Sequence, residues 1–183
     1  MRFAPLALGC LLLTACEFSM SSTTAVSAGT PEPAAPAASP MAGWSVQGAA
    51  HDAYAAEIDP QAPREGHATI RFHPTRDPEG GYGTYMTSLD AAPVRGRRAH
   101  AIIWVRTQGV TARGDVWLRA QGIDSPADGP GMGYASARLA PSADFTRYEL
   151  FVDVPPDAAH LQLGVGIGGP GMLWLDGVRI EAL

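Results

Sequence analysis

Residues 160–181 read H-L-Q-L-G-V-G-I-G-G-P-G-M-L-W-L-D-G-V-R-I-E, and this stretch decides the fold. Every second position from 161 to 167 is a large aliphatic residue, whereas the positions between them are Gln162 and glycines. A period of two is typical of a β-strand that buries one of its faces. The sequence therefore predicts a strand over 161–167, which ends at the Gly-Gly-Pro-Gly turn of 168–171.

A second strand is predicted over 173–180, where Leu173 and Leu175 continue the alternation. After the pair Asp176-Gly177 the alternation changes phase, because the apolar positions are then Val178 and Ile180. One extra residue in a strand produces such a change, and so does a two-residue Asp-Gly hairpin turn. The pattern thus allows either a β-bulge at Gly177 or a hairpin turn there.

Further strand patterns occur at regular intervals upstream, separated by Gly, Pro and Asp. They cover residues 44–47, 53–58, 67–72, 82–87, 98–106, 114–121, 133–139 and 146–154. A sustained 3.6-residue apolar stripe, which would indicate a helix, is not found. We therefore expect an all-β domain over 44–183, folded as an antiparallel sandwich or barrel.

Several tryptophans lie on strand faces that are not the obvious core. In 98–106 the odd positions are apolar, so Trp104 and Arg106 point the other way. In 114–121 the even positions are apolar, which leaves Trp117 and Arg119 on the opposite face. Trp174 is placed likewise in the last strand. If 98–106 and 114–121 form a hairpin, their Trp and Arg side chains share one ligand platform. If consecutive strands belong to opposite sheets, they do not.

An ordered series of motifs carries a resemblance to a known family. The motifs are R-G-R-R-A-H-A-I-I-W-V-R-T (95–107), V-W-L-R (116–119), F-T-R-Y-E-L-F-V-D-V-P (145–155) and the last part of the stretch quoted above (164–181). Over 44–183 the chain resembles the galactose-binding-like jelly roll shared by many carbohydrate-binding modules. A similar domain occurs beside AraC-type transcriptional regulators. The resemblance implies an antiparallel jelly-roll β-sandwich, a fold that hosts sugar binding, protein docking and purely structural roles.

The resemblance also implies one metal hypothesis. In calcium-stabilised sandwiches of this kind, an Asp at the start of the last strand binds a structural ion together with a carboxylate from the N-terminal strands. Asp176 is the matching residue, with Glu57 or Asp59 as its partner. The alternative is that Asp176 only fixes the turn before Gly177, in which case the domain needs no cofactor.

The N-terminal residues determine the expected compartment. Residues 1–15 combine Arg2 with a short apolar run, as a signal peptide does. The sequence L-T-A-C at 13–16 resembles a bacterial lipobox, which implies that Cys16 is acylated and becomes the mature N-terminus. Glu17 in place of Asp then favours the outer membrane of a Gram-negative cell, with the domain facing the periplasm. Residues 16–43 are rich in Ala, Pro, Ser and Thr, so we expect a disordered tether.

Composition excludes several functions. The formal net charge of −5 argues against a nucleic-acid-binding surface, which needs a basic stripe. The chain has two cysteines, Cys10 in the signal peptide and the lipidated Cys16, so the domain is expected to hold no disulfide or cysteine metal site. No serine stands in a G-x-S-x-G context, and nothing marks a catalytic pair of carboxylates. We therefore expect no enzyme.

Two functions remain. The first is a lipid-anchored, non-catalytic envelope protein whose sandwich binds a glycan or another envelope ligand, with Trp104, Arg106, Trp117, Arg119 and Trp174 as the binding residues. The alternative is a structural or assembly lipoprotein that docks to a protein partner and takes no small ligand. The two differ in whether the tryptophans that point away from the core reach solvent together.

Overall fold

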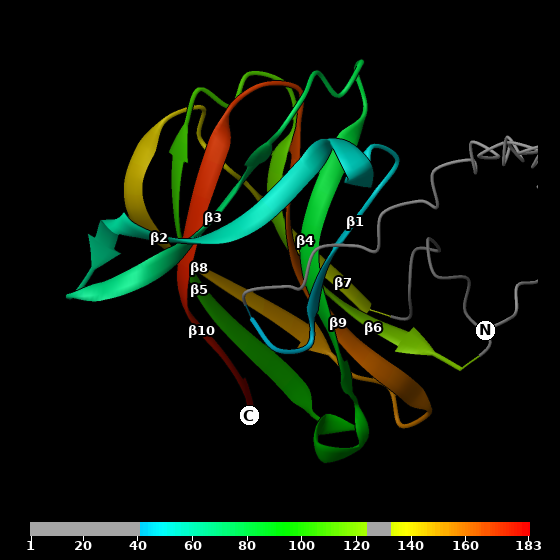
Figure 1. Cartoon of the computed structure of the whole chain (residues 1–183). Coiled ribbons are helices and arrows are strands. Elements are labelled where there is room, and N and C mark those ends of the chain that lie inside the picture. Colours follow the sequence, from blue (N-terminus) through cyan, green and yellow to red (C-terminus); the bar gives the residue numbers. More distant parts are fainter. Residues whose placement is uncertain (1–40, 124–132) are drawn as a thin grey trace, which may run out of the picture. The chain divides into compact units, whose positions relative to one another are not determined.

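The described part of the chain, residues 41–123 and 133–183 of a computed structural model, contains ten β-strands and two single-turn 3-10 helices (Figure 1). The strands are β1 (Trp44–Gln47), β2 (Tyr54–Arg64), β3 (His67–Pro74), β4 (Tyr82–Asp90), β5 (Arg98–Gln108), β6 (Gly114–Gly122), β7 (Gly133–Arg138), β8 (Ala143–Asp153), β9 (Ala158–Gly168) and β10 (Met172–Ala182). The short helices are η1 (His51–Ala53) and η2 (Ala92–Val94). Each predicted strand is present.

The strands form two five-stranded antiparallel sheets. One sheet has the order β1-β4-β9-β6-β7 and is called the β9 sheet below; the other has the order β2-β3-β10-β5-β8 and is called the β10 sheet. The two sheets pack face to face around a shared core, so the predicted antiparallel jelly-roll sandwich is confirmed. Within the described residues, no helix is long and apolar enough to cross a membrane.

The two strands predicted from the opening stretch lie at the centres of the two sheets. The aliphatic side chains of β9, from Leu161 to Ile167, are at most 1% exposed, and Leu173 and Leu175 of β10 are fully buried. Each such side chain contributes roughly 1.5–3 kcal/mol to folding by leaving water. The buried side chains of β9 and of β10 point into the same core. This one stretch of sequence therefore supplies the central strand of each sheet.

The change of phase in β10 is a β-bulge. Its pairing with β5 shifts register between Asp176 and Arg179, and the strand continues to Ala182 without turning back. Gly177 has a φ of +59°, and a Cβ there would lie 2.9 Å from Cδ1 of Trp104. The hairpin alternative is therefore excluded, and glycine is required at the bulge for both its backbone angle and its close contact.

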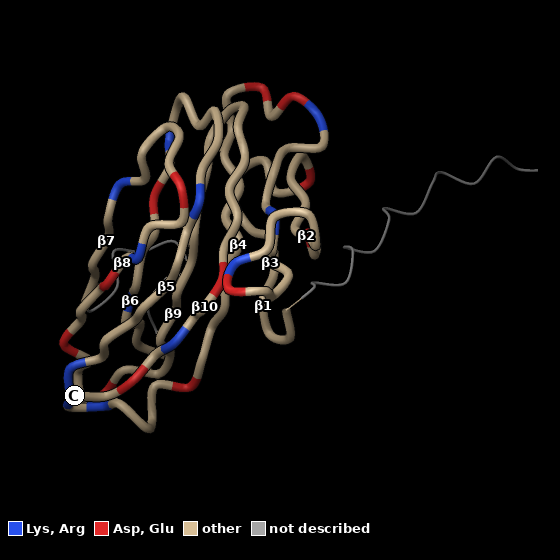
Figure 2. Tube along the Cα trace, turned by 90° about the vertical axis from the view of Figure 1, so that its left-hand side faces the viewer, with Lys and Arg blue, Asp and Glu red and all other residues tan. Residues whose placement is uncertain are grey.

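Acidic and basic residues are interspersed along the described strands and loops, as the coloured trace in Figure 2 shows. Along β10, for example, Asp176, Arg179 and Glu181 follow one another. Among residues 41–123 and 133–183, most acidic and basic groups form ion pairs, such as Arg64 with Asp176 and Arg113 with Asp115. Patches in which one sign dominates are therefore informative about function.

Candidate functional site

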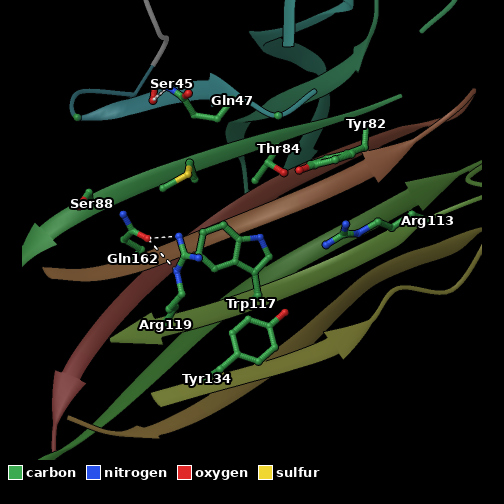
Figure 3. Close-up of a pocket in the computed structure, with 13 residues that line it drawn as sticks. Ser45, Gln47, Tyr82, Thr84, Ser88, Arg113, Trp117, Arg119, Tyr134 and Gln162 are labelled. Carbon is green, nitrogen blue, oxygen red and sulfur yellow. Dashed lines mark hydrogen bonds between the residues drawn. The ribbon is translucent and has the colours of Figure 1, made fainter. Parts of the chain in front are cut away.

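A pocket lies on the outer face of the β9 sheet, away from the core (Figure 3). Its volume is about 580 Å³, within the usual range for small-molecule sites. Strands β1 and β4 form one side with Ser45, Gln47, Tyr82 and Thr84, whereas β6, β9 and β7 form the other. Five strands thus contribute to one hollow.

The glycines of β9 make room for this pocket. A Cβ at Gly164 would lie 2.5 Å from Cζ2 of Trp117, so the indole of that residue rests directly on the β9 backbone. A Cβ at Gly166 would lie 2.9 Å from Oδ1 of Asp115. Side chains of β6 therefore lie across β9 where a larger residue would stand. The alternate glycines of the opening stretch are what lowers the pocket floor.

Three aromatic rings line the pocket. Trp117 forms part of the floor and is 8% exposed, whereas Tyr82 of β4 and Tyr134 of β7 are 37% and 53% exposed. Figure 3 shows Trp117 between the two arginines of the pocket, with Tyr134 beside it. Exposed aromatic faces in a hollow present flat apolar surfaces to a ligand.

Arg119 of β6 is bonded to Gln162 and lies over the ring of Trp117. Its Nε and Nη2 both donate to Oε1 of Gln162, at 3.0 and 2.5 Å, across the β6–β9 pair. Its guanidinium carbon lies 5.4 Å from the ring centroid of Trp117, in cation–π distance. The amide and the indole both contribute to the orientation of this guanidinium.

Arg113 stands at the other end of the pocket and has a charged partner. Its Nε and Nη2 donate to Oδ2 of Asp115, at 3.2 and 2.9 Å, and its guanidinium lies 5.0 Å from the ring of Tyr82. The hydrogen bond to Asp115 raises the pKa of Arg113 above its ordinary value, so this group stays protonated. Oδ1 of Asp115 is buried without a hydrogen-bond partner among the described residues. Among the described residues, the hydrogen bonds of the Asp115 side chain therefore come from Arg113, through Oδ2.

The structure brings only part of the predicted platform together. Trp117 and Arg119 lie in the pocket, but Trp104, Arg106 and Trp174 lie on the outer face of the β10 sheet. The hairpin hypothesis for β5 and β6 is wrong, because these consecutive strands belong to different sheets. Side-chain alternation cannot reveal this, since it specifies which face is apolar and not which sheet holds the strand. Ligand contact by any of the five residues stays a prediction.

The outer face of the β10 sheet is closed by its own side chains. Nε1 of Trp174 donates to Oδ2 of Asp59 at 2.8 Å, and Arg106 lies 4.9 Å from the Trp174 ring. Arg64 covers Trp104 at 4.1 Å. The indole hydrogen bond is the main reason why the pKa of Asp59 lies below its ordinary value. On this face the aromatic rings and the charged groups contact one another through a hydrogen bond and cation–π contacts.

The two predicted calcium ligands are each engaged by cations. Glu57 accepts hydrogen bonds from Arg71 and from Nε2 of His73, and chiefly the first of these lowers the pKa of Glu57. Asp176 accepts from Nη1 of Arg64 at 3.1 Å. Within residues 41–123 and 133–183, no three potential metal ligands form a group. The calcium hypothesis stays a prediction, to be checked by thermal melts with calcium and with chelator.

Sequence reasoning missed Tyr82, Tyr134, Arg113 and Gln162 as pocket residues. Gln162 had a signal, because it is the polar member of the alternation in 161–167. The other three belong to strands or turns whose position beside β9 depends on the strand order β4-β9-β6-β7. That order is not encoded in any local pattern.

Comparison with known proteins supports the fold. No family model matches the chain. An uncharacterized HTH-type transcriptional regulator, YbfP of Bacillus subtilis (strain 168), is 26% identical over 144 residues. The match covers 77% of this chain and 48% of the regulator, so the chain spans about half the length of that relative. This agrees with the resemblance to a domain found beside transcriptional regulators.

Solved structures with the same architecture include several carbohydrate-binding modules. The CBM22-2 xylan-binding domain of Paenibacillus barcinonensis Xyn10C is similar with a TM-score of 0.55 and 13% identity, over 78% of this chain and 93% of that domain. TmCBM61, solved with β-1,4-galactotriose, gives 0.51 and 9%, over 78% and 90%. The enzymatically active domain of tailspike protein 4 from bacteriophage CBA120 gives 0.61 and 14%, over 78% of this chain and 20% of that one. At these identities the likeness establishes the jelly-roll fold.

Proposed function

We propose that this chain is a glycan-binding module. The observation that carries the proposal is the pocket on the β9 sheet, which combines three aromatic rings with amide, hydroxyl and guanidinium groups. Aromatic faces pack against the apolar C–H faces of pyranose rings, and the polar groups hydrogen-bond to sugar hydroxyls. The likeness to modules solved as xylan-binding and galactotriose-bound domains supports the same function.

The proposed function is binding without catalysis. None of the described residues that line the pocket is a carboxylate, a histidine or a cysteine. Hydrolysis of a glycosidic bond ordinarily uses two carboxyl groups that flank the bond. The groups present instead suit recognition, because hydroxyls, amides and guanidinium groups hold a ligand without supplying an acid and a nucleophile at neutral pH.

We further propose that the module is anchored in the cell envelope. The support is the sequence of residues 1–16, which has the pattern of a lipoprotein signal peptide ending in an acylated Cys16. Residues 16–43 would then tether the domain to the outer membrane on its periplasmic side. Residues 1–40, including Cys16, lie outside the described structure. An anchored module of this kind would hold glycan close to the membrane.

The binding proposal is tested with the full chain purified in detergent. Soluble polysaccharides are titrated against wild type, Tyr82→Ala and Tyr134→Ala, and affinity is measured by calorimetry. We expect each substitution to weaken binding about fivefold to tenfold, because each removes a stacking surface. Phe151→Ala is the matched control, since that ring is 39% exposed on the other sheet.

Two results would contradict the binding proposal. In the first, both tyrosine variants bind as tightly as the wild type does, so that any site lies elsewhere. In the second, a folded and anchored chain binds no polysaccharide, which would favour docking to a protein partner.

The anchor is tested separately with Cys16→Ser. This variant should lose palmitate labelling and should leave the detergent phase in phase partitioning, because the thiol that carries the lipid is gone. Unchanged labelling and partitioning would overturn the anchor and leave the glycan proposal intact.

A further inference from the structure

One long edge of the β10 sheet is open. β8 is the last strand in the order β2-β3-β10-β5-β8, and among the described strands it pairs with β5 alone. It runs for 11 residues and contains no proline. The strand at the opposite edge, β2, carries Pro60 and Pro63, which cannot donate backbone hydrogen bonds to another chain. An unprotected strand of this length can accept an added strand.

The backbone groups on the open side of β8 follow from its pairing with β5. The N–H of Val154 donates to the carbonyl of Arg97, which stands opposite it when the register is continued by one residue. Bonding alternates along an antiparallel pair, so the even-numbered residues of β8 direct their N–H and C=O groups to β5. The same groups of Arg147, Glu149 and Phe151 therefore point to the open side, where no described strand lies next to β8.

The side chains beside this edge are charged and aromatic. Arg147 and Glu149 form an ion pair along the strand, and both are partly exposed. The ring of Phe151 stacks on His100 and is still 39% exposed. Opposite charges thus stand at equal distances on the two sides of Tyr148. Such a stretch is complementary to itself when two copies of it run antiparallel.

The other sheet ends on the same side of the sandwich. β7 is the last described strand of the β9 sheet, and its first residue lies against the end of β8. A Cβ on Gly133 would lie 2.8 Å from the carbonyl oxygen of Asp153 and 2.8 Å from Cγ1 of Val152. Since both layers end here, a second sandwich can align its own two layers with them.

We propose that two copies of this chain associate edge to edge through β8, with Tyr148 opposite Tyr148 of the second copy. Arg147 then lies opposite Glu149 of the second copy, and the two residues exchange backbone hydrogen bonds. The two β10 sheets become one continuous sheet. The two-fold axis is perpendicular to that sheet, so both pockets open on the same side. This association does not depend on glycan binding.

Sedimentation of the full chain in density-matched detergent tests the association. We expect the protein mass to rise from one chain to two between about 5 and 200 μM, as suits a small interface. Arg147→Glu should weaken the association at least about tenfold, because it places like charges opposite each other at two symmetric positions. Glu149→Arg should weaken it to a similar extent for the same reason.

An equimolar mixture of these two variants separates the interface from the stability of each chain. One variant has two acids beside the edge and the other has two bases, so a mixed pair is complementary at both symmetric positions. We expect the mixture to regain the association of the wild type. Within each chain the like charges stay adjacent, so this rescue cannot come from repair of the single chain.

Arg179→Glu is the matched control. Arg179 pairs with Glu181 along β10 as Arg147 pairs with Glu149 along β8, and both glutamates bond to His100. The substitution makes the same change in net charge on a strand that is not at the edge. The association should therefore be unchanged. Unfolding curves establish which of the variants are folded.

Disulfide cross-linking gives a second measurement that does not depend on charge. Tyr148→Cys should form a cross-linked dimer under mild oxidation with copper phenanthroline, because directly opposite positions bring the Cβ atoms within reach of a disulfide. Phe151→Cys should not, since position 151 lies opposite position 145 in this register. The wild type, with Cys10 and Cys16 only, is the blank.

The outcomes decide the proposal as follows. A wild type that stays monomeric over the whole concentration range overturns it. So does a mixture of the two charge variants that fails to associate, or an equal loss of association in Arg179→Glu. Cross-linking of Phe151→Cys in place of Tyr148→Cys also overturns it. If a charge variant is unfolded, the wild-type masses and the cross-linking comparison still decide.

Discussion

The outer faces of the two sheets carry the same pairs of residue types and differ in what covers them. On the β9 sheet, Arg119 lies over Trp117 beside a hollow of about 580 Å³. On the β10 sheet, Arg106 lies over Trp174, and the indole N–H is bonded to the buried carboxylate of Asp59. Tryptophan and arginine together therefore do not identify a binding face.

The difference comes from the central strand of each sheet. On its outer side β9 presents Gly164 and Gly166, which have no side chains. The side chains of Trp117 and Asp115 on β6 therefore lie directly against the β9 backbone, and the pocket forms over them. At the equivalent place β10 presents Trp174 and Asp176, which fill the surface and bind Asp59 and Arg64 of β2. Backbone exposed by glycine makes a pocket, whereas large side chains at the same positions make a second packed layer.

The largest expected effect follows from changing this central strand. Gly164→Ala places a Cβ 2.5 Å from Cζ2 of Trp117, so the indole must move away from the β9 backbone. We expect the free energy of unfolding to fall by about 2–3 kcal/mol and glycan binding to be lost. Urea denaturation, followed by tryptophan fluorescence, measures the first effect.

Gly168→Ala is the control for this change on the same strand. Its Cβ would meet Cβ of Arg113 at 3.4 Å, a contact that small shifts can accommodate. We expect a much smaller loss of stability than for Gly164→Ala. Equal losses of stability in the two variants would contradict the idea that Gly164 is needed to make room for the indole of Trp117.

The next effect concerns the closed face. Trp174→Phe keeps the ring and removes the N–H that donates to Oδ2 of Asp59, leaving that buried carboxylate short of a donor. We expect a destabilisation of about 1–2 kcal/mol in urea denaturation, with glycan affinity unchanged. The matched substitution in the pocket, Trp117→Phe, should reverse this order by weakening glycan binding more than stability. Altered glycan binding in Trp174→Phe would break the distinction between the two faces.

A smaller effect is expected for Arg64, which covers Trp104 and bonds to Asp176. Arg64→Met keeps the apolar stem and removes both the cation–π contact and the ion pair. We expect thermal melts to show a loss of about 0.5–1 kcal/mol, because both partners lie near the surface. High salt should reduce this loss of stability, because salt screens the ion pair between Arg64 and Asp176. A loss as large as that of Trp174→Phe would show that Arg64 organises the whole face.

The smallest effect is a dependence of stability on acid pH. The pKa values of Asp59 and Glu57 are lowered in the folded protein, by hydrogen bonds from Trp174 and Arg71 respectively. Their stabilising contribution is complete above the pKa values of the unfolded chain and is lost as pH falls through the folded values. Stability should therefore decrease below about pH 4, where unfolded carboxyl groups begin to take up protons. Denaturation midpoints from pH 6 to pH 2 measure it, and Asp59→Asn should flatten the curve.

Two residues of the candidate site were predicted from the sequence, and the rest depended on contacts between distant strands. Trp117 and Arg119 were identified because the opposite face of their strand is uniformly apolar. Trp104 and Arg106 show the same pattern and lie on the other sheet, since alternation is identical whichever sheet a strand joins. Tyr134, in a short strand without a strong apolar face, gave no signal.

The sequence by itself determined the ten strands and, for those with clear alternation, the faces that they bury. These follow from alternation with a period of two, which is a local property of the chain. Tertiary structure alone decided which strands are neighbours, that Gly177 is a bulge, and which Trp–Arg pair borders a hollow. Those features depend on pairing across 40 or more residues, as between Arg119 and Gln162, and many pairings satisfy the same local patterns. The pairing that is formed is the one that best buries and packs the apolar side chains in the shared core.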